Sequence, residues 1–331
     1  MKISAVYIAK NEEENISRSL ESLKGLVDEL ILVDTGSVDD TVKIFQSYGG
    51  SVYHLSWSDD FSAPRNLAIS KATGDWLILL DADEYFTYET VTNLRKVIEE
   101  NLGYNGFYIN ITNINKITGE ALDSFYTLRI VKKQKGLAYY GRIHEELLIN
   151  GETIENAIFI SKSLLNINHT GYTPEISEYK CRRNLKILKQ ELLEGYNPAS
   201  LYTYFAECYD GIGDINNMLK YAWLDIEQGR RRVTYASRSY RKLIKYFAYN
   251  GTIDERLAVI RKALKDFPEL PEFHAEIGAC YEIKGCYINA IEELLLSVDL
   301  YINYKGFEPC LMNDEDVENI LGHVESIIKK F

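Results

Sequence analysis

The chain has 331 residues, of which 46% are hydrophobic and 26% charged, a composition typical of a folded globular protein. Its net charge of −12 excludes a surface built to bind nucleic acid, because such a surface must be basic. No apolar run approaches the ~20 residues of a membrane span, and the N-terminus lacks a signal-peptide core. The five cysteines form no CxxC pair, so neither a disulfide framework nor a zinc site is indicated. We therefore expect a cytoplasmic protein, long enough for two domains.

The first hundred residues alternate short apolar runs with segments of helical spacing. Strands are expected at residues 3–9, 29–34, 51–54 and 76–80. Helices are expected at 11–23, after the turn at 35–41 as far as residue 45, at 61–72 and at 90–101. Ser37 and Asp40 are spaced like a capping box for the second helix. Further strands are expected around 107–111 and 125–132, with an acceptor-side loop at 113–124. The alternation predicts an α/β fold with a mostly parallel sheet flanked by helices.

The most informative stretch is the apolar run 76–80, which ends at three carboxylates. A short unbroken run of this kind predicts a strand buried on both faces. Asp81, Asp83 and Glu84 would then stand at its carboxyl end, where open α/β sheets bind their ligands. Two oxygen donors at a strand end suit Mg²⁺ or Mn²⁺. The alternative is a solvated acidic turn after a core strand.

Three predicted strands deliver polar groups to the same edge of the sheet. Asn11, Asp34 and the pair Asp81 and Asp83 all follow strand ends, and right-handed crossovers place those ends together. The chain contains neither GxGxxG nor a Walker lysine pattern, so no dinucleotide or P-loop site is supported. A pocket of acids that receives phosphates needs positive charge, which a divalent cation and Arg65 could supply.

Four motifs together resemble those of family 2 glycosyltransferases of the GT-A fold. They are Lys-Asn-Glu-Glu at 10–13, Val-Asp-Thr-Gly-Ser-Val-Asp-Asp-Thr at 33–41, Trp-Ser-Asp-Asp-Phe-Ser-Ala-Pro-Arg-Asn at 57–66, and the stretch 74–84 that ends in Asp-Ala-Asp-Glu. The Trp-x-Asp-Asp-Phe-Ser and Asp-Ala-Asp-Glu versions are similar to a branch with C-terminal helical repeats, which includes bacteriocin S-glycosyltransferases. They also resemble lipopolysaccharide-core glucosyltransferases. The resemblance implies a nucleotide-diphosphate sugar donor, Mg²⁺ or Mn²⁺, and transfer with inversion.

The resemblance also implies which residues contact the nucleobase. Ile8 and Lys10, near the end of the first strand, would lie against the base, and Asp34 would accept a hydrogen bond from a uracil-like edge. Many relatives carry a second acid after this aspartate, whereas this chain has Thr35. The base specificity therefore stays open between uracil, guanine and thymine.

For the diphosphate and the metal, the resemblance points to three residues. Arg65 would face the base or the diphosphate, Asp81 would approach the ribose and metal-bound water, and Asp83 would bind the metal directly. Pro64 replaces the alanine that usually precedes the Arg-Asn pair. Because a proline is tolerated in the first turn of a helix, the arginine should not be disturbed.

An inverting transfer needs a general base, and the stretch 140–147 is the best source of one. Glu145 is the candidate, with His144 as its neighbour or substitute; the alternative is a polar turn with a surface His-Glu pair. Farther along, His169 closes a short strand before Gly-Tyr and could complete the metal shell. The alternative for His169 is a structural or surface histidine.

From residue 178 onward the pattern is helical, and an internal repeat appears. Ala206-x₂-Tyr-x₃-Gly recurs at Leu243 and at Gly278, with steps of 37 and 35 residues. These steps are near the ~34 residues of a tetratricopeptide (TPR) repeat. We therefore predict a GT-A family 2 catalytic domain at 1–177 and an all-α, TPR-like domain at 178–331.

Two roles for the repeats remain open. Their concave face, expected around Tyr202, Tyr235 and His274, could hold a peptide or protein acceptor. Alternatively, the repeats only stabilise the catalytic domain or hold a homodimer together.

The leading hypothesis is a metal-dependent inverting glycosyltransferase. It would move a hexose from a nucleotide-diphosphate sugar, with UDP as the leading candidate nucleotide, to a peptide, a protein or a cell-envelope glycan. The alternative is a helical-repeat scaffold protein with an inactive transferase domain. A nucleotidyltransferase is disfavoured because residues 11–14 are Asn-Glu-Glu-Glu where a Gly-rich basic loop is needed.

Overall fold

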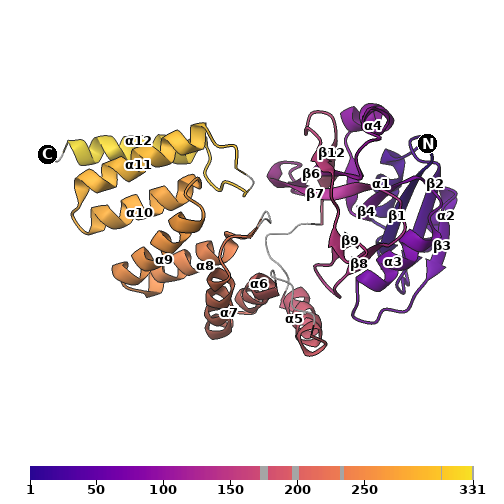
Figure 1. Ribbon diagram of the computed structural model, residues 1–331, viewed down its shortest axis with the longest axis horizontal. Coiled ribbons are helices and arrows are strands. Elements are labelled where there is room, and N and C mark those ends of the chain that lie inside the picture. Colours follow the sequence, from indigo (N-terminus) through magenta and orange to yellow (C-terminus); the bar gives the residue numbers. More distant parts are fainter. Residues whose placement is uncertain (172–177, 196–200, 232–234, 307, 330–331) are drawn as a thin grey trace. The chain divides into compact units, whose positions relative to one another are not determined.

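The computed structural model describes residues 1–171, 178–195, 201–231, 235–306 and 308–329 (Figure 1). The chain divides into two compact units, Met1–Ile176 with Lys186–Tyr196, and Ser177–Leu185 with Asn197–Phe331. Helix α5 (Glu178–Leu193) contributes to both units. The predicted domain boundary between residues 177 and 178 therefore stays a prediction.

The first unit is built on a mixed, mostly parallel sheet, ordered β3-β2-β1-β4-β7-β6-β12-β5 with β11 beside β6. Its strands are β1 (Ile3–Ala9), β2 (Glu29–Asp34), β3 (Ser51–His54), β4 (Trp76–Asp81), β5 (Glu84–Phe86), β6 (Gly106–Ile114), β7 (Ala121–Lys132), β11 (Ala157–Phe159) and β12 (Asn166–His169). The flanking helices are α1 (Ile16–Ser22), α2 (Thr41–Ser47), α3 (Ser62–Lys71) and α4 (Tyr88–Glu100). A small second sheet contains β8 (Leu137–Tyr140), β9 (Glu146–Ile149) and β10 (Glu152–Thr153). The predicted fold class is confirmed.

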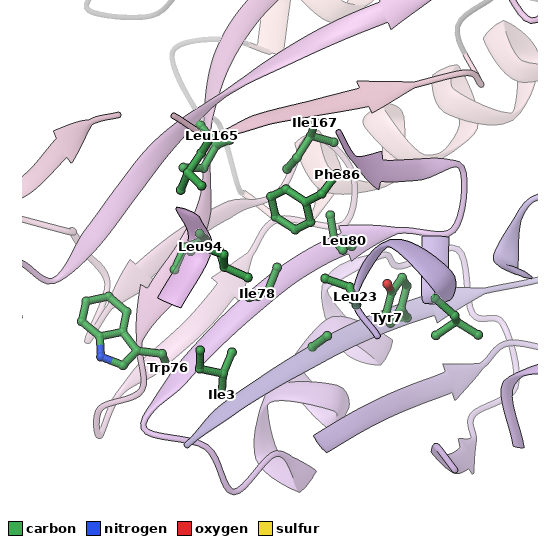
Figure 2. Close-up of a cluster of buried hydrophobic side chains, with 14 of the residues drawn as sticks. Ile3, Tyr7, Leu23, Trp76, Ile78, Leu80, Phe86, Leu94, Leu165 and Ile167 are labelled. Carbon is green, nitrogen blue, oxygen red and sulfur yellow. The ribbon is translucent and has the colours of Figure 1, made fainter. Parts of the chain in front are cut away.

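Strand β4 lies at the centre because its side chains are apolar on both faces. Trp76, Ile78 and Leu80 join the core beneath α1, α2 and α4 (Figure 2). Leu77 and Leu79 join the core beneath α3 on the opposite face. Burying a Leu or Ile side chain stabilises a fold by about 1.5–3 kcal/mol. The double burial of β4 therefore fixes the place at which its terminal acids emerge.

Three local predictions were wrong. The first helix begins at Ile16 and not at residue 11, because Asn11 has a φ of 58° and residues 12–15 form a turn. The Ser37–Asp40 capping box does not form; Ser37 donates its N–H to Asp34 instead. Half of the expected acceptor-side loop at 113–124 is strand, and only residues 115–120 form a connection, the hairpin turn that joins β6 to β7.

The second unit is helical throughout its described residues. After α5 it contains α6 (Leu201–Gly211), α7 (Ile215–Glu227), α8 (Arg238–Asn250), α9 (Ile253–Asp266), α10 (Pro271–Ile283), α11 (Tyr287–Ile302) and α12 (Asp314–Ile328). The three copies of the repeat motif fall on the alternate helices α6, α8 and α10. At Gly278 an added Cβ would lie 2.9 Å from Leu294 of the next helix, so this position must stay small.

Ion pairs connect alternate helices of this unit, and a hydrogen bond connects the consecutive helices α10 and α11. Glu207 of α6 pairs with Arg238 of α8 at 2.8 Å, and Arg241 pairs with Glu272 of α10 at 2.5 Å. His274, expected on the concave face, is buried and bonded to Glu293, so it is a structural histidine and not a surface contact. No described helix combines the length and apolar character that crossing a membrane requires.

Candidate active site

The parallel register of β1, β2 and β4 brings the polar strand ends to one edge of the sheet. Ala9 pairs with Asp34, and Ile8 pairs with Asp81. Ile8, near the end of β1, is partly buried, and Lys10, which follows the strand, is exposed. The candidate nucleobase residues therefore lie side by side, as the strand order requires.

Asp34 is almost completely buried and is held by its own turn. Its carboxylate accepts hydrogen bonds from the backbone N–H groups of Gly36 and Ser37 and lies 3.2 Å from Nδ1 of His54. Burial would raise the pKa of Asp34, but these hydrogen bonds hold it below its ordinary value. Thr35, which replaces the usual second acid, is buried, and its hydroxyl donates to the carbonyl of Ala9.

A continuous chain of charged groups crosses the rest of the edge, and we call it the ion-pair chain. It runs Glu145–Arg65–Asp81–Arg129–Glu84, with residues from the segment before β9, from α3, β4, β7 and β5. Arg65 donates from Nε to Glu145 at 2.5 Å and from Nη2 to Asp81 Oδ1 at 2.8 Å. Arg129 donates from Nη2 to Asp81 Oδ2 at 3.2 Å and to Glu84 Oε1 at 2.5 Å.

The surroundings give the carboxylates of this chain different electrostatics. Burial alone would raise the pKa of Asp81, but the charges of Arg65 and Arg129 on either side hold it well below its ordinary range. Burial raises the pKa of Glu84 to about 7 against the opposing charge of Arg129. Asp81 therefore stays ionised, whereas Glu84 takes up a proton more readily even beside Arg129.

The segment that carries Glu145 is held from two sides. Ser62 at the start of α3 donates to the carbonyl of Gly141, and the backbone N–H of Phe61 donates to the carbonyl of Arg142 at 2.7 Å. Glu191 of α5, within the first unit, accepts from the N–H groups of Arg142 and Ile143. His144 is exposed and has a φ of 53°, so its side chain and that of Glu145 take different directions from the backbone.

The two predicted metal ligands lie beside each other. Asp83 Oδ2 is 3.4 Å from Nε2 of His169, because β12 pairs antiparallel with β5 and aligns His169 with Glu84. Nδ1 of His169 is 2.7 Å from the side-chain oxygen of Asn113 on β6. Burial would lower the pKa of His169, but Asp83 raises it overall. Asn113 thus orients the ring with Nε2 toward Asp83.

Asp83 and His169 provide only part of the coordination that a divalent cation needs. Among the described residues no group of three or more His, Cys, Asp and Glu side chains is arranged to hold a metal, so Asp83 and His169 make a two-ligand set. A carboxylate oxygen and an imidazole nitrogen fit Mn²⁺ or Mg²⁺ when a diphosphate and water complete the coordination. Gly171 packs closely against this pair, because a Cβ there would lie 1.7 Å from Asp83 Oδ2.

Arg129 and Asn113 belong to this site but were not predicted from the sequence. Arg129 stands alone as a charge between Leu128 and the buried residues Ile130 and Val131, which was the one available signal. Asn113 fell in the segment predicted as a loop, so its place beside His169 could not be foreseen.

Residues 4–155 match the family described as Glycosyl transferase family 2. The matched residues include the predicted nucleobase and diphosphate residues, Asp83 and Glu145, whereas His169 lies outside the match.

Among curated proteins, the chain is similar to a TPR repeat-containing protein of Synechococcus elongatus, 46% identical over 99 residues, which are 30% of this chain and 25% of that protein. It is also similar to the SPbeta prophage-derived glycosyltransferase SunS of Bacillus subtilis, 28% identical over 212 residues, which are 62% of this chain and 49% of SunS. The chain thus spans a quarter to about half the length of these relatives.

Among solved structures, S. aureus TarS 1-349 in complex with UDP-GlcNAc is 18% identical and has a TM-score of 0.46, covering 78% of this chain and 90% of that one. Glucosyl-3-phosphoglycerate synthase from Mycobacterium tuberculosis, in complex with Mn²⁺, UDP and glucosyl-3-phosphoglycerate, is 15% identical and has a TM-score of 0.38, covering 60% and 81%.

Gly171→Ala should disturb the Asp83–His169 pair. The new methyl group would lie within 1.7 Å of Asp83 Oδ2 and 3.0 Å of His169 Nε2, so the carboxylate must turn away. We expect Mn²⁺-dependent binding of UDP, measured by calorimetry, to weaken by about 10-fold or more, the scale of outer-shell changes at metal sites. Gly103→Ala is the matched control, because nothing lies within 4 Å of its added Cβ. Equal affinity in both variants would contradict the assignment of this pair.

Proposed function

We propose that the chain is a metal-dependent inverting glycosyltransferase that transfers a hexose from a nucleotide-diphosphate sugar, with UDP as the nucleotide. The observation that supports this most is the meeting of Asp34, Asp81, Asp83, Arg65 and Glu145 at one edge of the sheet within a family 2 domain. Base-binding, diphosphate-binding and proton-accepting groups then follow one another along that edge.

Donor binding would use the beginning of this edge. Ile8 and Lys10 would lie against the nucleobase, and Asp34, whose carboxylate is fixed by its turn, would accept a hydrogen bond from the uracil N–H. Asp81 would reach the ribose with the part of its carboxylate that stays accessible, because its side chain is 34% exposed. Arg65 would contribute its charge on the diphosphate side.

Asp83 and His169 are the residues that would hold Mg²⁺ or Mn²⁺. A bound cation would neutralise charge on the diphosphate as it leaves. Asn113 holds the imidazole with Nδ1 occupied, which leaves Nε2 available on the Asp83 side. Such orientation by a second hydrogen bond is the usual way in which a metal-binding histidine is fixed.

Glu145 would act as the general base. Its carboxylate is held by Arg65 and is mostly shielded from water, so it is oriented before the acceptor arrives. It would take the proton from the acceptor group while that group attacks the sugar from the face opposite the diphosphate. His144 is the substitute candidate on the same segment.

The acceptor would be a peptide or protein bound by the helical repeats. Stacked helix pairs provide an extended surface, and the described residues of the second unit contain no counterpart of the ion-pair chain around Arg65. A cell-envelope glycan is the alternative acceptor, and homodimer formation is the alternative role of the repeats.

Binding of UDP should depend on a divalent cation and on Asp83. Without the cation, the diphosphate would face Asp83 with no compensating charge, because Arg65 and Arg129 are already paired with Asp81. Calorimetry of UDP with and without Mn²⁺ should show binding only with the metal in the wild type, and none in Asp83→Ala. Equal affinity in EDTA would contradict the role of the metal. Unchanged affinity in Asp83→Ala would move the ligand elsewhere.

Glu145→Gln should bind the donor normally and lose turnover by ~10²-fold or more, the scale of general-base removal. The amide keeps the shape of the side chain and an oxygen for the contact with Arg65, but it cannot take the proton. Initial rates at saturating donor measure this, and UDP calorimetry provides the control. A near-normal rate would reject Glu145 and direct the same test to His144.

Substitutions in the helical repeats should change the binding of the acceptor and leave the reaction with the donor unchanged. Arg238→Glu breaks the 2.8 Å pair with Glu207 between α6 and α8 and reverses a charge on that face. We expect the apparent KM for a peptide acceptor to rise severalfold, while donor hydrolysis without acceptor stays unchanged. Arg261→Glu, an exposed position on α9, is the matched control. If the two variants behave alike toward the acceptor, the repeats have only a structural role.

A further inference from the structure

Arg129 is a largely buried cation that stands next to the two core residues of β7. Its side chain is 14% exposed, and its neighbours Ile130 and Val131 are fully buried on opposite faces of the sheet. Its Nε has no hydrogen-bond partner within the part of the chain that the structure describes. Burying a guanidinium is costly unless carboxylates compensate it. The contacts that offset this cost therefore indicate what Arg129 does.

Those contacts hold the end of β4 and the start of β5 together. Nη2 of Arg129 reaches Asp81 Oδ2 at 3.2 Å and Glu84 Oε1 at 2.5 Å. The other oxygen of Glu84 accepts the backbone N–H of Asp81 at 3.1 Å. Arg129, Glu84 and Asp81 thus form a closed ring of hydrogen bonds around the turn that carries the predicted metal ligand Asp83.

The two arginines that contact Asp81 have different partners. Arg65 takes Oδ1 of Asp81 and also holds Glu145, so it connects the donor edge to the general base. Arg129 takes Oδ2 and has carboxylate partners only at the ends of β4 and β5. With one guanidinium on each oxygen, the plane of the Asp81 carboxylate is fixed. Removing Arg129 would free Oδ2 and let Asp81 turn toward Arg65.

We propose that Arg129 is a positioning residue for the donor: it fixes the Asp81 carboxylate and the 81–84 turn in the orientation that binds the nucleotide-diphosphate sugar. This inference rests on the proposed function and concerns the same site. Arg129 acts through Asp81 and Glu84 and need not touch the donor. A purely structural role, in which Arg129 only neutralises the buried Glu84, is the competing explanation.

Three variants separate these explanations. Arg129→Met leaves Glu84 buried with no counter-charge and should lower the melting temperature. Arg129→Met combined with Glu84→Gln removes both charges and should restore the melting temperature, because a neutral pair needs no compensation. Arg129→Lys keeps one positive charge, but the ammonium sits on a shorter side chain than Nη2, which makes both bonds, and is more strongly hydrated, so it should hold the two carboxylates less well.

The measurement is calorimetry of UDP with Mn²⁺, followed by donor kinetics. We expect the double variant to melt like the wild type yet bind UDP at least 10-fold more weakly, with a donor KM raised more than kcat is lowered. Arg129→Lys should fold and also bind more weakly. Arg95→Met is the control, because Arg95 pairs with Asp28 at 2.9 Å away from this edge, and it should bind UDP normally.

Wild-type affinity in the double variant and in Arg129→Lys would overturn the positioning role and leave Arg129 as a counter-charge for Glu84. If the double variant does not fold, Arg129→Lys decides the matter alone: weaker binding supports the inference and unchanged binding overturns it. A wild-type protein that binds no UDP with Mn²⁺ overturns the proposed function itself, and this inference with it.

Discussion

The contact on which the rest of the site depends is the one between Arg65 and its two carboxylates. Asp81 ends the central strand, whereas Glu145 comes from a segment of another layer, and Arg65 holds both at hydrogen-bond distance. An arginine can do this because its planar fork presents several N–H donors in fixed directions. A lysine at this position could not hold both oxygens with the same geometry. The separation between Asp81 and the proposed base Glu145 is therefore set by one guanidinium.

The elements around Arg65 serve to keep that guanidinium in place. Helix α3 is fixed against β8 by Asn66, whose side chain donates to the carbonyl of Tyr139 at 2.9 Å and accepts its N–H at 2.7 Å. The ring of Tyr139 lies 5.4 Å from the Arg65 guanidinium, which gives the cation an aromatic face. Arg65 and Arg129 balance two of the three carboxylates of the ion-pair chain. The remaining negative charge is the reason why the proposed diphosphate ligand is expected to bring a cation with it.

The sequence predicted what depends on strand order and missed what depends on pairing across the sheet. Asp34 and Asp81 could be placed together because parallel strands end at one edge. The partnership of Asp81 with Arg129 requires β7 to pair antiparallel with β4, and no local pattern states which strands pair. Strand β7 was predicted too short at its start because residues 121–124 are all exposed and lack the alternation that marks a half-buried strand.

In the helical unit the same distinction appears on a smaller scale. The repeat motif was visible because small and aromatic residues must recur where paired helices approach each other, as Gly278 does against Leu294. The pairs Glu207–Arg238 and Arg241–Glu272 were not visible, because each connects two helices that are separated in sequence by another helix. These pairs neutralise much of the charge along one row of helices. A peptide bound there would have to be recognised by its shape and backbone more than by its net charge, since the opposite charges it could meet are already engaged with each other.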